Sequence, residues 1–246
     1  MSVGGRTLGA MQTDISALGT IMGIWAHPDD EAYLSGGLMA LARANGQRVV
    51  CVTATRGELG TTAPVAWPPE RLAAERTREL ADCLNVLGVH EHHWLDYRDG
   101  GCAAADAPTA ISRLAELVAQ IRPDTVLTFG PDGMTGHDDH ISVSRWTASA
   151  FGRVAKDGAT LHYATNTPTW LARYREPLDA HNVFMGAEPP CTPADELSIG
   201  ETFTGELLDT KLGAIRSMTS QVEPLVNALG EDFFREGMAE EAFRRA

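Results

Sequence analysis

Short apolar runs alternate with longer amphipathic segments between residues 20 and 165. The apolar runs have the length and the β-branched content of buried strands, and they cover 20–26, 47–55, 91–97, 123–130 and 159–167. The segments between them carry apolar residues at helical spacing, and they cover 32–45, 70–88, 109–122 and 137–155. This alternation predicts an α/β fold whose mostly parallel sheet is covered by helices on both faces.

The pattern is less regular on either side of this region. Residues 1–18 look like a loose N-terminal tail, and residues 166–210 are rich in proline without a clear period, so their role stays open. The segments 205–229 and 231–246 have helical spacing. Since a chain of 246 residues suits one large domain, we expect a single domain over 19–246 with an elaborated C-terminal part.

The composition narrows the class of protein. The net charge of −13 argues against nucleic acid or an anionic membrane surface as the main partner, because both would repel the chain. The four cysteines include no CxxC pair, no apolar run is as long as a membrane span, and the N-terminus lacks the features of a signal peptide. We therefore expect a cytoplasmic enzyme that acts on a small molecule. The sequence leaves an oligomer possible.

Two clusters of ionisable residues follow expected strands. GIWAHPDDE places His27, Asp29, Asp30 and Glu31 directly after an apolar run, and TGHDDH lies at 135–140. Because the carboxyl ends of parallel strands meet at one edge of the sheet, both clusters are expected at the same crevice. So many ionisable groups at a buried edge cost desolvation unless something binds them. The two clusters together predict a metal site.

Zinc hydrolases commonly use three His or carboxylate ligands and leave a fourth position for the water that attacks the substrate. A separate base takes the proton of this water. His27, one acid of the first cluster and His140 can supply the ligands, the remaining acid can be the base, and His137 can stabilise the oxyanion. The adjacent acids point in different directions, and the chemistry alone does not assign their roles.

The motif AHPDDE with a downstream GHxDH resembles the LmbE-like, or PIG-L, family of zinc-dependent N-acetylglucosamine deacetylases. TRGE at 55–58, RTRELADCLNVLGV at 76–89 and LDYRDG at 95–100 are similar to further segments of that family in the same order. The resemblance covers residues 20–150. It implies a Rossmann-like, three-layer fold and hydrolysis of the N-acetyl group of a glucosamine-type sugar, with release of acetate.

The resemblance also implies the metal ligands and the catalytic groups. His27, Asp30 and His140 would hold Zn²⁺, although this ligand set also suits Fe²⁺ or another divalent metal. Asp29 would be the general base that activates a zinc-bound water. His137 would be an acid or oxyanion stabiliser.

Four further residues receive roles from the resemblance. Asp139 would orient a catalytic histidine through its ring nitrogen. Arg76 matches an arginine that reaches sugar hydroxyls, and Asp99 matches an acid of the sugar pocket; we expect Glu58 to bind substrate as well. Arg76 could instead be a solvated helix residue paired with a neighbouring acid.

The chain departs from the family pattern at three positions. Asp138 stands where many members have a proline, and Thr135 stands where some deacetylases have a tyrosine. The tyrosine's oxyanion role therefore does not carry over. Met218 stands where a histidine is usual.

Three alternatives stay open. The first is a metal-dependent hydrolase of another amide or ester, and the HD pair of HDDH would also suit a phosphoesterase, although such HD enzymes are helical. The second is a sugar-binding module without turnover. The third is a polar network without metal, in which Asp29 or Asp30 caps the following helix.

Overall fold

The computed structural model describes residues 13–61 and 63–246. Its strands are β1 (Ile21–Trp25), β2 (Val49–Thr55), β3 (Glu91–Tyr97), β4 (Thr125–Phe129), β5 (Thr160–Thr165), β6 (Ile199–Thr202) and β7 (Glu240–Arg245). They form one sheet in the order β3-β2-β1-β4-β5-β7-β6. Strands β1 to β5 run parallel, whereas β7 is antiparallel to both of its neighbours, β5 and β6. The predicted α/β fold with a mostly parallel sheet is confirmed.

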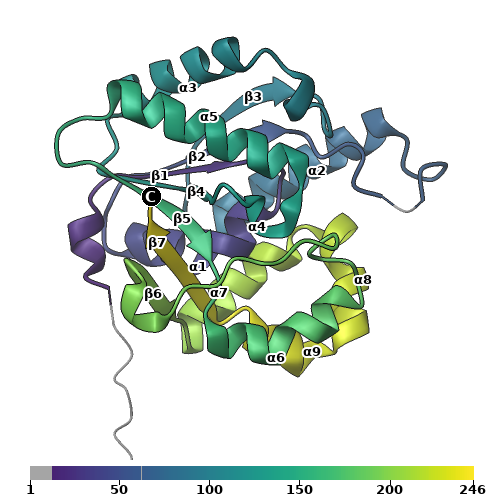
Figure 1. The fold of residues 1–246 in the computed structure, drawn as a ribbon. Helices are drawn as coiled ribbons and strands as arrows, with labels where there is room; N and C mark the ends of the chain where they lie inside the picture. The colour runs from purple at the N-terminus through teal and green to yellow at the C-terminus, as the bar shows by residue number, and fades with distance from the viewer. Residues whose placement is uncertain (1–12, 62) are drawn as a thin grey trace, which may run out of the picture.

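Helices cover both faces of this sheet. They are α1 (Asp30–Ala44), α2 (Pro69–Val86), α3 (Ala107–Ile121), α4 (Gly133–Gly136), α5 (Asp138–Val154), α6 (Pro168–Asp179), α7 (Gly205–Arg216), α8 (Thr219–Leu229) and α9 (Glu231–Gly237). Short 3-10 turns lie at η1 (Ile15–Leu18), η2 (Cys102–Ala104) and η3 (Ala194–Glu196). α3 and α5 pack together on one face, whereas α1, α2 and α7 pack on the other (Figure 1).

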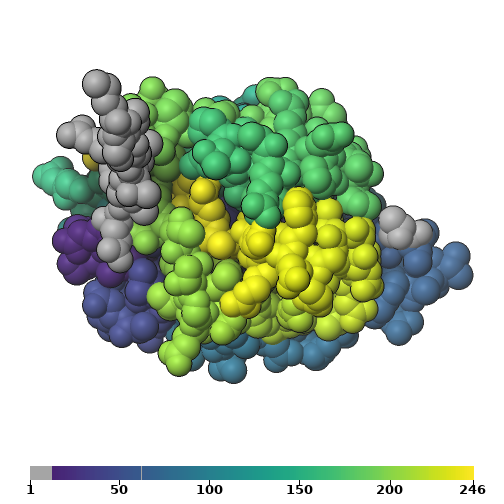
Figure 2. Space-filling model, turned by 90° about the horizontal axis from the view of Figure 1, so that it is seen from below, coloured from purple at the N-terminus to yellow at the C-terminus, as the bar shows by residue number. Residues whose placement is uncertain are grey.

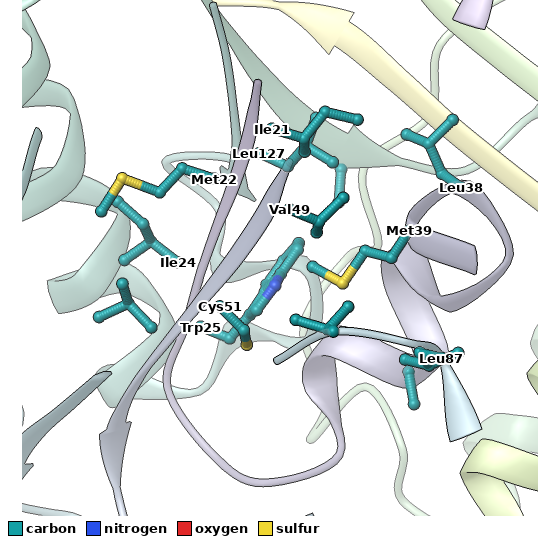
Figure 3. Packing of buried hydrophobic residues seen from close by; sticks show 14 of the residues in the cluster. Ile21, Met22, Ile24, Trp25, Leu38, Met39, Val49, Cys51, Leu87 and Leu127 are labelled. Atoms are coloured by element: carbon teal, nitrogen blue, oxygen red, sulfur yellow. The ribbon is translucent and has the colours of Figure 1, made fainter. Parts of the chain in front are cut away.

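Strand β1 lies at the centre of the hydrophobic core. All five of its residues are buried, as expected for a parallel strand covered on both faces. Figure 3 shows its side chains alternating, with Met22 and Ile24 on one side and Trp25 on the side of Met39 in α1. The ring of Trp25 meets that of Phe129 edge to face, with centroids 5.1 Å apart. The core therefore extends to the end of β4, where one of the two clusters follows.

The strand order reverses at β1, which lies between β2 and β4. From β1 the chain proceeds to β2 and β3 on one side, and then returns to β4 and β5 on the other. In open α/β sheets such a reversal opens a crevice beyond the carboxyl ends of the strands, where ligands bind. Both ionisable clusters lie at this crevice, because they directly follow β1 and β4.

The C-terminal part folds differently from the prediction. Residues 166–210, which the sequence left unassigned, contain α6 and β6. The helix expected over 231–246 stops at Gly237, and β7 follows. The prediction was wrong there because pairing with β5 and β6 and burial of Phe243 outweigh local helical spacing. Figure 2 shows this yellow C-terminal segment beside the green segment that contains α6.

The expected loose tail is only partly described. Residues 1–12 lie outside the described residues, but residues 13–18 are ordered by contacts with the rest of the chain. Leu18 is buried, and the backbone N–H of Thr13 donates to Glu201 at 2.6 Å. The prediction of a loose tail was therefore wrong for 13–18. Among the helices of the described residues, none has the length and apolar character that a membrane crossing needs.

Candidate metal centre and catalytic site

The first cluster forms a tight turn between β1 and α1. The carboxylate of Asp30 accepts the backbone N–H groups of Ala26 and His27, at 3.2 and 2.8 Å, and so fixes the turn. Asp29 has a positive φ of 134°, a backbone conformation that an L-residue rarely adopts. The turn therefore orients the two adjacent aspartates in different directions.

The second cluster lies at the start of α5. His137 is the N-cap of this helix, and its Nδ1 accepts the backbone N–H of Asp139 at 3.1 Å. His140 lies in the first turn, where its ring stacks on Phe129 with centroids 4.1 Å apart. Its Nδ1 donates to the carbonyl of Gly133 at 3.0 Å, so its Nε2 carries a free lone pair. Burial also holds the pKa of His140 well below its usual value, which keeps the ring neutral.

Three predicted ligands converge between the two clusters. Nδ1 of His27 lies 3.0 Å from Nε2 of His140. Oδ2 of Asp30 lies 3.7 Å from the first of these nitrogens, and its Oδ1 lies 3.4 Å from the second. Two imidazole nitrogens and one carboxylate are a donor set that zinc commonly takes. The donor set therefore suits a divalent metal.

His137 lies close to the same place. One ring nitrogen from each of His27, His137 and His140 falls within 4.8 Å of the others. Since Nδ1 of His137 is engaged with a backbone N–H, only its Nε2 can face a ligand. A three-histidine set is thus a second geometry that the cluster offers. We prefer Asp30 because its carboxylate contacts both of the other nitrogens and would balance the charge of a cation.

Two further carboxylates hold His27 from behind. Its Nε2 lies 3.1 Å from Asp99 and 3.3 Å from Asp139, and because both partners are carboxylates this nitrogen carries the hydrogen. Burial lowers the pKa of His27, but the hydrogen bonds to Asp139 and Asp99 outweigh it and raise the pKa to about 10. The surroundings of His27 therefore favour a positive charge, as a cation site requires. Such carboxylate-histidine pairs orient metal ligands in many proteins.

Asp139 was expected to orient a catalytic histidine, and its carboxylate instead contacts His27, an expected metal ligand. The same carboxylate accepts the backbone N–H groups of Gly100 and Cys102, at 2.7 and 2.9 Å. Burial alone would raise the pKa of Asp139, but the hydrogen bonds from His27 and from the two backbone N–H groups outweigh it and keep the pKa below the usual value. The loop after β3 is thereby tied to the start of α5.

Asp29 lies beside the convergent ligands and forms an ion pair with Arg76 at 2.9 Å. Burial raises the pKa of Asp29 to about 6, although the charge of Arg76 works against the shift. A carboxylate with this pKa is ionised at neutral pH and still basic enough to accept a proton. The predicted general base thus has both a suitable position and a suitable pKa.

The three expected substrate-binding residues lie in different surroundings. Arg76 is buried behind Asp29 and donates to the carbonyls of Gly57 and Pro28. Asp99 accepts the N–H of Leu59 at 2.8 Å besides contacting His27. Both residues thus position other groups of the protein, although Nε of Arg76 is buried without a partner. A contact with substrate stays a prediction for each.

Glu58 lies outside the cavity that contains Arg76 and Asp99. Its Oε1 accepts the backbone N–H of Asp99 at 3.0 Å, and its Oε2 is buried without a partner. The side chain therefore supports the loop after β3. A contact with substrate stays a prediction for Glu58 too.

Two cavities meet at the convergent ligands. We call the first the polar chamber; its volume is about 290 Å³, and its wall includes His27, Asp29, Arg76, Asp99, His137 and Gln221. We call the second the apolar chamber; its volume is about 250 Å³, and its wall includes Tyr33, Leu34, Trp170, Leu178, Phe184 and Leu225. Asp30 and His140 also line the apolar chamber. The candidate metal centre thus separates a polar space from an apolar one.

Residues 22–151 match the protein family described as GlcNAc-PI de-N-acetylase, PIG-L. The chain belongs to the PIG-L family. Membership confirms the predicted resemblance. The match covers β1 to most of α5, which is the part of the chain that carries both ionisable clusters.

Curated relatives in the PIG-L family include two 1D-myo-inositol 2-acetamido-2-deoxy-alpha-D-glucopyranoside deacetylases. That of Kineococcus radiotolerans is 38% identical over 56% of this chain and 46% of its own length. That of Salinispora arenicola is 31% identical over 85% of this chain and 79% of its own length. The chain thus spans less than half of the first relative and most of the second.

Solved structures share the fold of this PIG-L chain. N,N'-diacetylchitobiose deacetylase from Pyrococcus horikoshii is 21% identical, with a TM-score of 0.62 over 92% of this chain and 83% of that one. GalB, the 4-carboxy-2-hydroxymuconate hydratase from Pseudomonas putida, is 16% identical, with a TM-score of 0.62 over 93% and 96%. The second case indicates that the fold alone does not determine the reaction.

Sequence reasoning missed parts of the PIG-L site that depend on distant contacts. Gln221 lines the polar chamber from the start of α8. The buried carboxylate of Glu79 accepts the backbone N–H of Ser220, at 2.7 Å, and so holds the start of this helix beside the chamber. The local sequence shows a glutamine in the first turn of a helix and an acid on the apolar face of α2. Neither pattern indicates which distant residue the side chain contacts.

Proposed function

We propose that this chain is a zinc-dependent hydrolase that removes the N-acetyl group from an N-acetylglucosaminyl compound. The observation that carries the proposal is the convergence of His27, Asp30 and His140 beside Asp29. The names of the curated relatives support an amino-sugar substrate. Zinc is preferred for its two nitrogens and one carboxylate, and Fe²⁺ or another divalent metal is the alternative.

The reaction needs a base, an oxyanion partner and a proton donor, and the chain supplies each. A bound divalent ion would polarise the acyl carbonyl and make the attacking water more acidic. Asp29 accepts the proton of this water, and Arg76 keeps the carboxylate oriented. In the neutral form of His137 the hydrogen is on Nε2, because Nδ1 accepts a backbone N–H, so Nε2 donates to the oxyanion. Asp29, which has taken up the proton of the water, then protonates the leaving amine. His137 could do so only in its doubly protonated form, in which its Nδ1 no longer accepts the backbone N–H of Asp139.

Metal content and acetate release together test this proposal. The purified protein should hold close to one zinc per chain and release acetate from N-acetylglucosaminyl-inositol or simpler N-acetylglucosamine derivatives, and a chelator should abolish the release. His140→Ala should lose both metal and activity. Asp138→Ala, on the exposed residue of the same helix turn, should keep both. Full acetate release by metal-free protein would refute the mechanism.

Two other functions remain as outcomes of that experiment. Metal binding without acetate release would indicate a hydrolase of another amide or ester, or a sugar-binding module. The cellular location is also a proposal: all four cysteines are free, which suits a reducing cytoplasm. We further propose that residues 19–246 form one domain, since the described strands belong to one sheet.

A further inference from the structure

The apolar chamber has more room than an acetyl group needs. Its volume is about 250 Å³, and Asp30 and His140 form the end that adjoins the candidate metal centre. A dry, apolar cavity of roughly 150 Å³ already binds a molecule of the size of benzene. The methyl group of an acetyl substrate would therefore leave most of this chamber unfilled.

Most of the polar side chains on the wall of the apolar chamber, the hydroxyl of Tyr33 apart, are engaged by the protein. Glu241 accepts the backbone N–H groups of Gly37 and Leu38, at 2.8 and 2.9 Å. Asn166 donates to the carbonyl of Pro190 at 3.1 Å. Among the described residues, none of the buried side-chain polar atoms without a partner lies on this wall. A polar ligand would find few partners there, whereas an apolar one would be matched.

The position of the catalytic groups decides which end of the substrate enters this chamber. Asp29 and His137 line the polar chamber and are absent from the apolar wall. The leaving amine needs a proton from one of them, so the amino sugar must lie in the polar chamber. The acyl substituent is bonded to the other side of the reacting carbon. It is therefore directed past Asp30 and His140 into the apolar chamber.

We propose that the preferred substrate carries a linear N-acyl chain of about four to eight carbons, which the apolar chamber receives. This inference rests on the proposed function and changes its acyl group. The amide C–N bond breaks, water supplies OH to the acyl carbon, and the amine nitrogen takes up a proton. The products are a free amino sugar and a short fatty acid.

A chain-length series tests the acyl group while the sugar stays constant. We would measure kcat/KM of the zinc-loaded protein with N-acetyl-, N-butyryl-, N-hexanoyl- and N-octanoylglucosamine. Each buried methylene should raise kcat/KM by about fourfold, so hexanoyl, with four methylenes more than acetyl, should exceed it by roughly 250-fold. A rate that is highest for acetyl and falls with each carbon would overturn the inference and leave the proposed function intact. Hydrolysis of none of the four would refute both.

A matched pair of variants on α8 distinguishes an effect on the apolar chamber from a general effect on folding. Leu225 and Leu229 are both half-buried and lie one turn apart, but only Leu225 lines the chamber. Leu225→Phe should reduce the ratio of hexanoyl to acetyl kcat/KM by about tenfold. Leu229→Phe should leave that ratio unchanged. An equal change in both variants would contradict the proposed location of the acyl chain.

Binding without turnover gives a second readout. In Asp29→Asn protein, calorimetry should give a more negative heat-capacity change for N-hexanoylglucosamine than for N-acetylglucosamine, because more apolar surface is buried. Leu225→Phe in the same background should remove this difference. The octyl glycoside of N-acetylglucosamine is the rival probe. If its binding shows the larger, Leu225-dependent change, the chamber holds an apolar aglycone and the inference is wrong.

Discussion

The two chambers share the candidate metal centre but differ in chemistry and in their origin along the chain. The polar chamber is lined mainly by segments that follow β1, β2, β3 and β4, together with the first turn of α8. The apolar chamber is lined largely by residues from 164 onward, with a contribution from α1. The first wall carries the expected base and the expected oxyanion donor. The second wall is mainly apolar, apart from the expected metal ligands Asp30 and His140 at one end. Substitutions in the apolar wall are therefore expected to change the choice of substrate without changing the reaction.

The largest expected effect lies on the polar side. Asp29→Asn removes the general base but preserves the shape of the side chain, so kcat should fall by about 10²–10⁴-fold. Metal content should stay unchanged, because Asp29 is not among the convergent ligands. Acetate release and metal analysis of the same preparation check both statements. Retained activity would assign the base to another residue, with His137 as the first to examine.

A smaller effect is expected behind the metal ligands. Asp139→Asn leaves one accepting oxygen where the carboxylate has two, so it cannot hold Gly100, Cys102 and the His27 ring together. Metal affinity should therefore fall by about 10–100-fold. Competition with a chelator of known affinity measures this. Asp138→Asn, at the neighbouring exposed position, is the control. Equal affinity in the two variants would mean that the contact between Asp139 and His27 has no role in metal binding.

The pH dependence reports on the pair formed by Asp29 and Arg76. Since the base must be ionised, kcat/KM should decline as the pH falls through about 6, the pKa to which burial raises Asp29. Arg76 opposes that rise in pKa, so Arg76→Met should move the acidic limb to higher pH, and Arg76→Lys should move it less. If all three proteins had the same pH profile, the acidic limb would have to come from a group other than Asp29.

The smallest effect on catalysis is expected from the apolar wall. Leu225→Ala removes a half-buried side chain, so the free energy of unfolding should fall by about 1–2 kcal/mol, less than for a fully buried leucine. Urea unfolding with an unchanged m-value measures this loss. The acidic limb of the pH profile and the metal affinity should stay as in the unaltered protein. A loss of metal affinity would show that the two chambers are coupled.

Local sequence was sufficient for the elements and residues that depend on near neighbours. The strand expected over 91–97 is β3 with the same bounds, and the other four expected strands differ from β1, β2, β4 and β5 by one or two residues at their ends. His27 and His140 could be proposed as metal ligands because each lies in a short motif that follows a buried strand. Their convergence also followed from topology, since parallel strands end at one edge.

Other features depended on contacts that no local pattern contains. β7 has helical spacing, yet it pairs with β5, whose residue His162 faces Arg245. The contact of Asp99 with a sugar stays a prediction, but its contact with the ring of His27 was not foreseen, because it joins the loop after β3 to the loop after β1. The wall of the apolar chamber could not be predicted either, since residues 166–210 have no period.

The unusual backbone of Asp29 has a consequence for how this chain can change over generations. With φ at 134°, the position would suit glycine better than aspartate, and such strain costs of order 1–3 kcal/mol. A glycine would relieve the strain and at the same time remove the base. Selection for folding acts in two directions here, because a glycine would also leave the buried Arg76 without its ion pair. A descendant that lost its reaction would therefore be expected to change both side chains together, while its sheet and its core persisted.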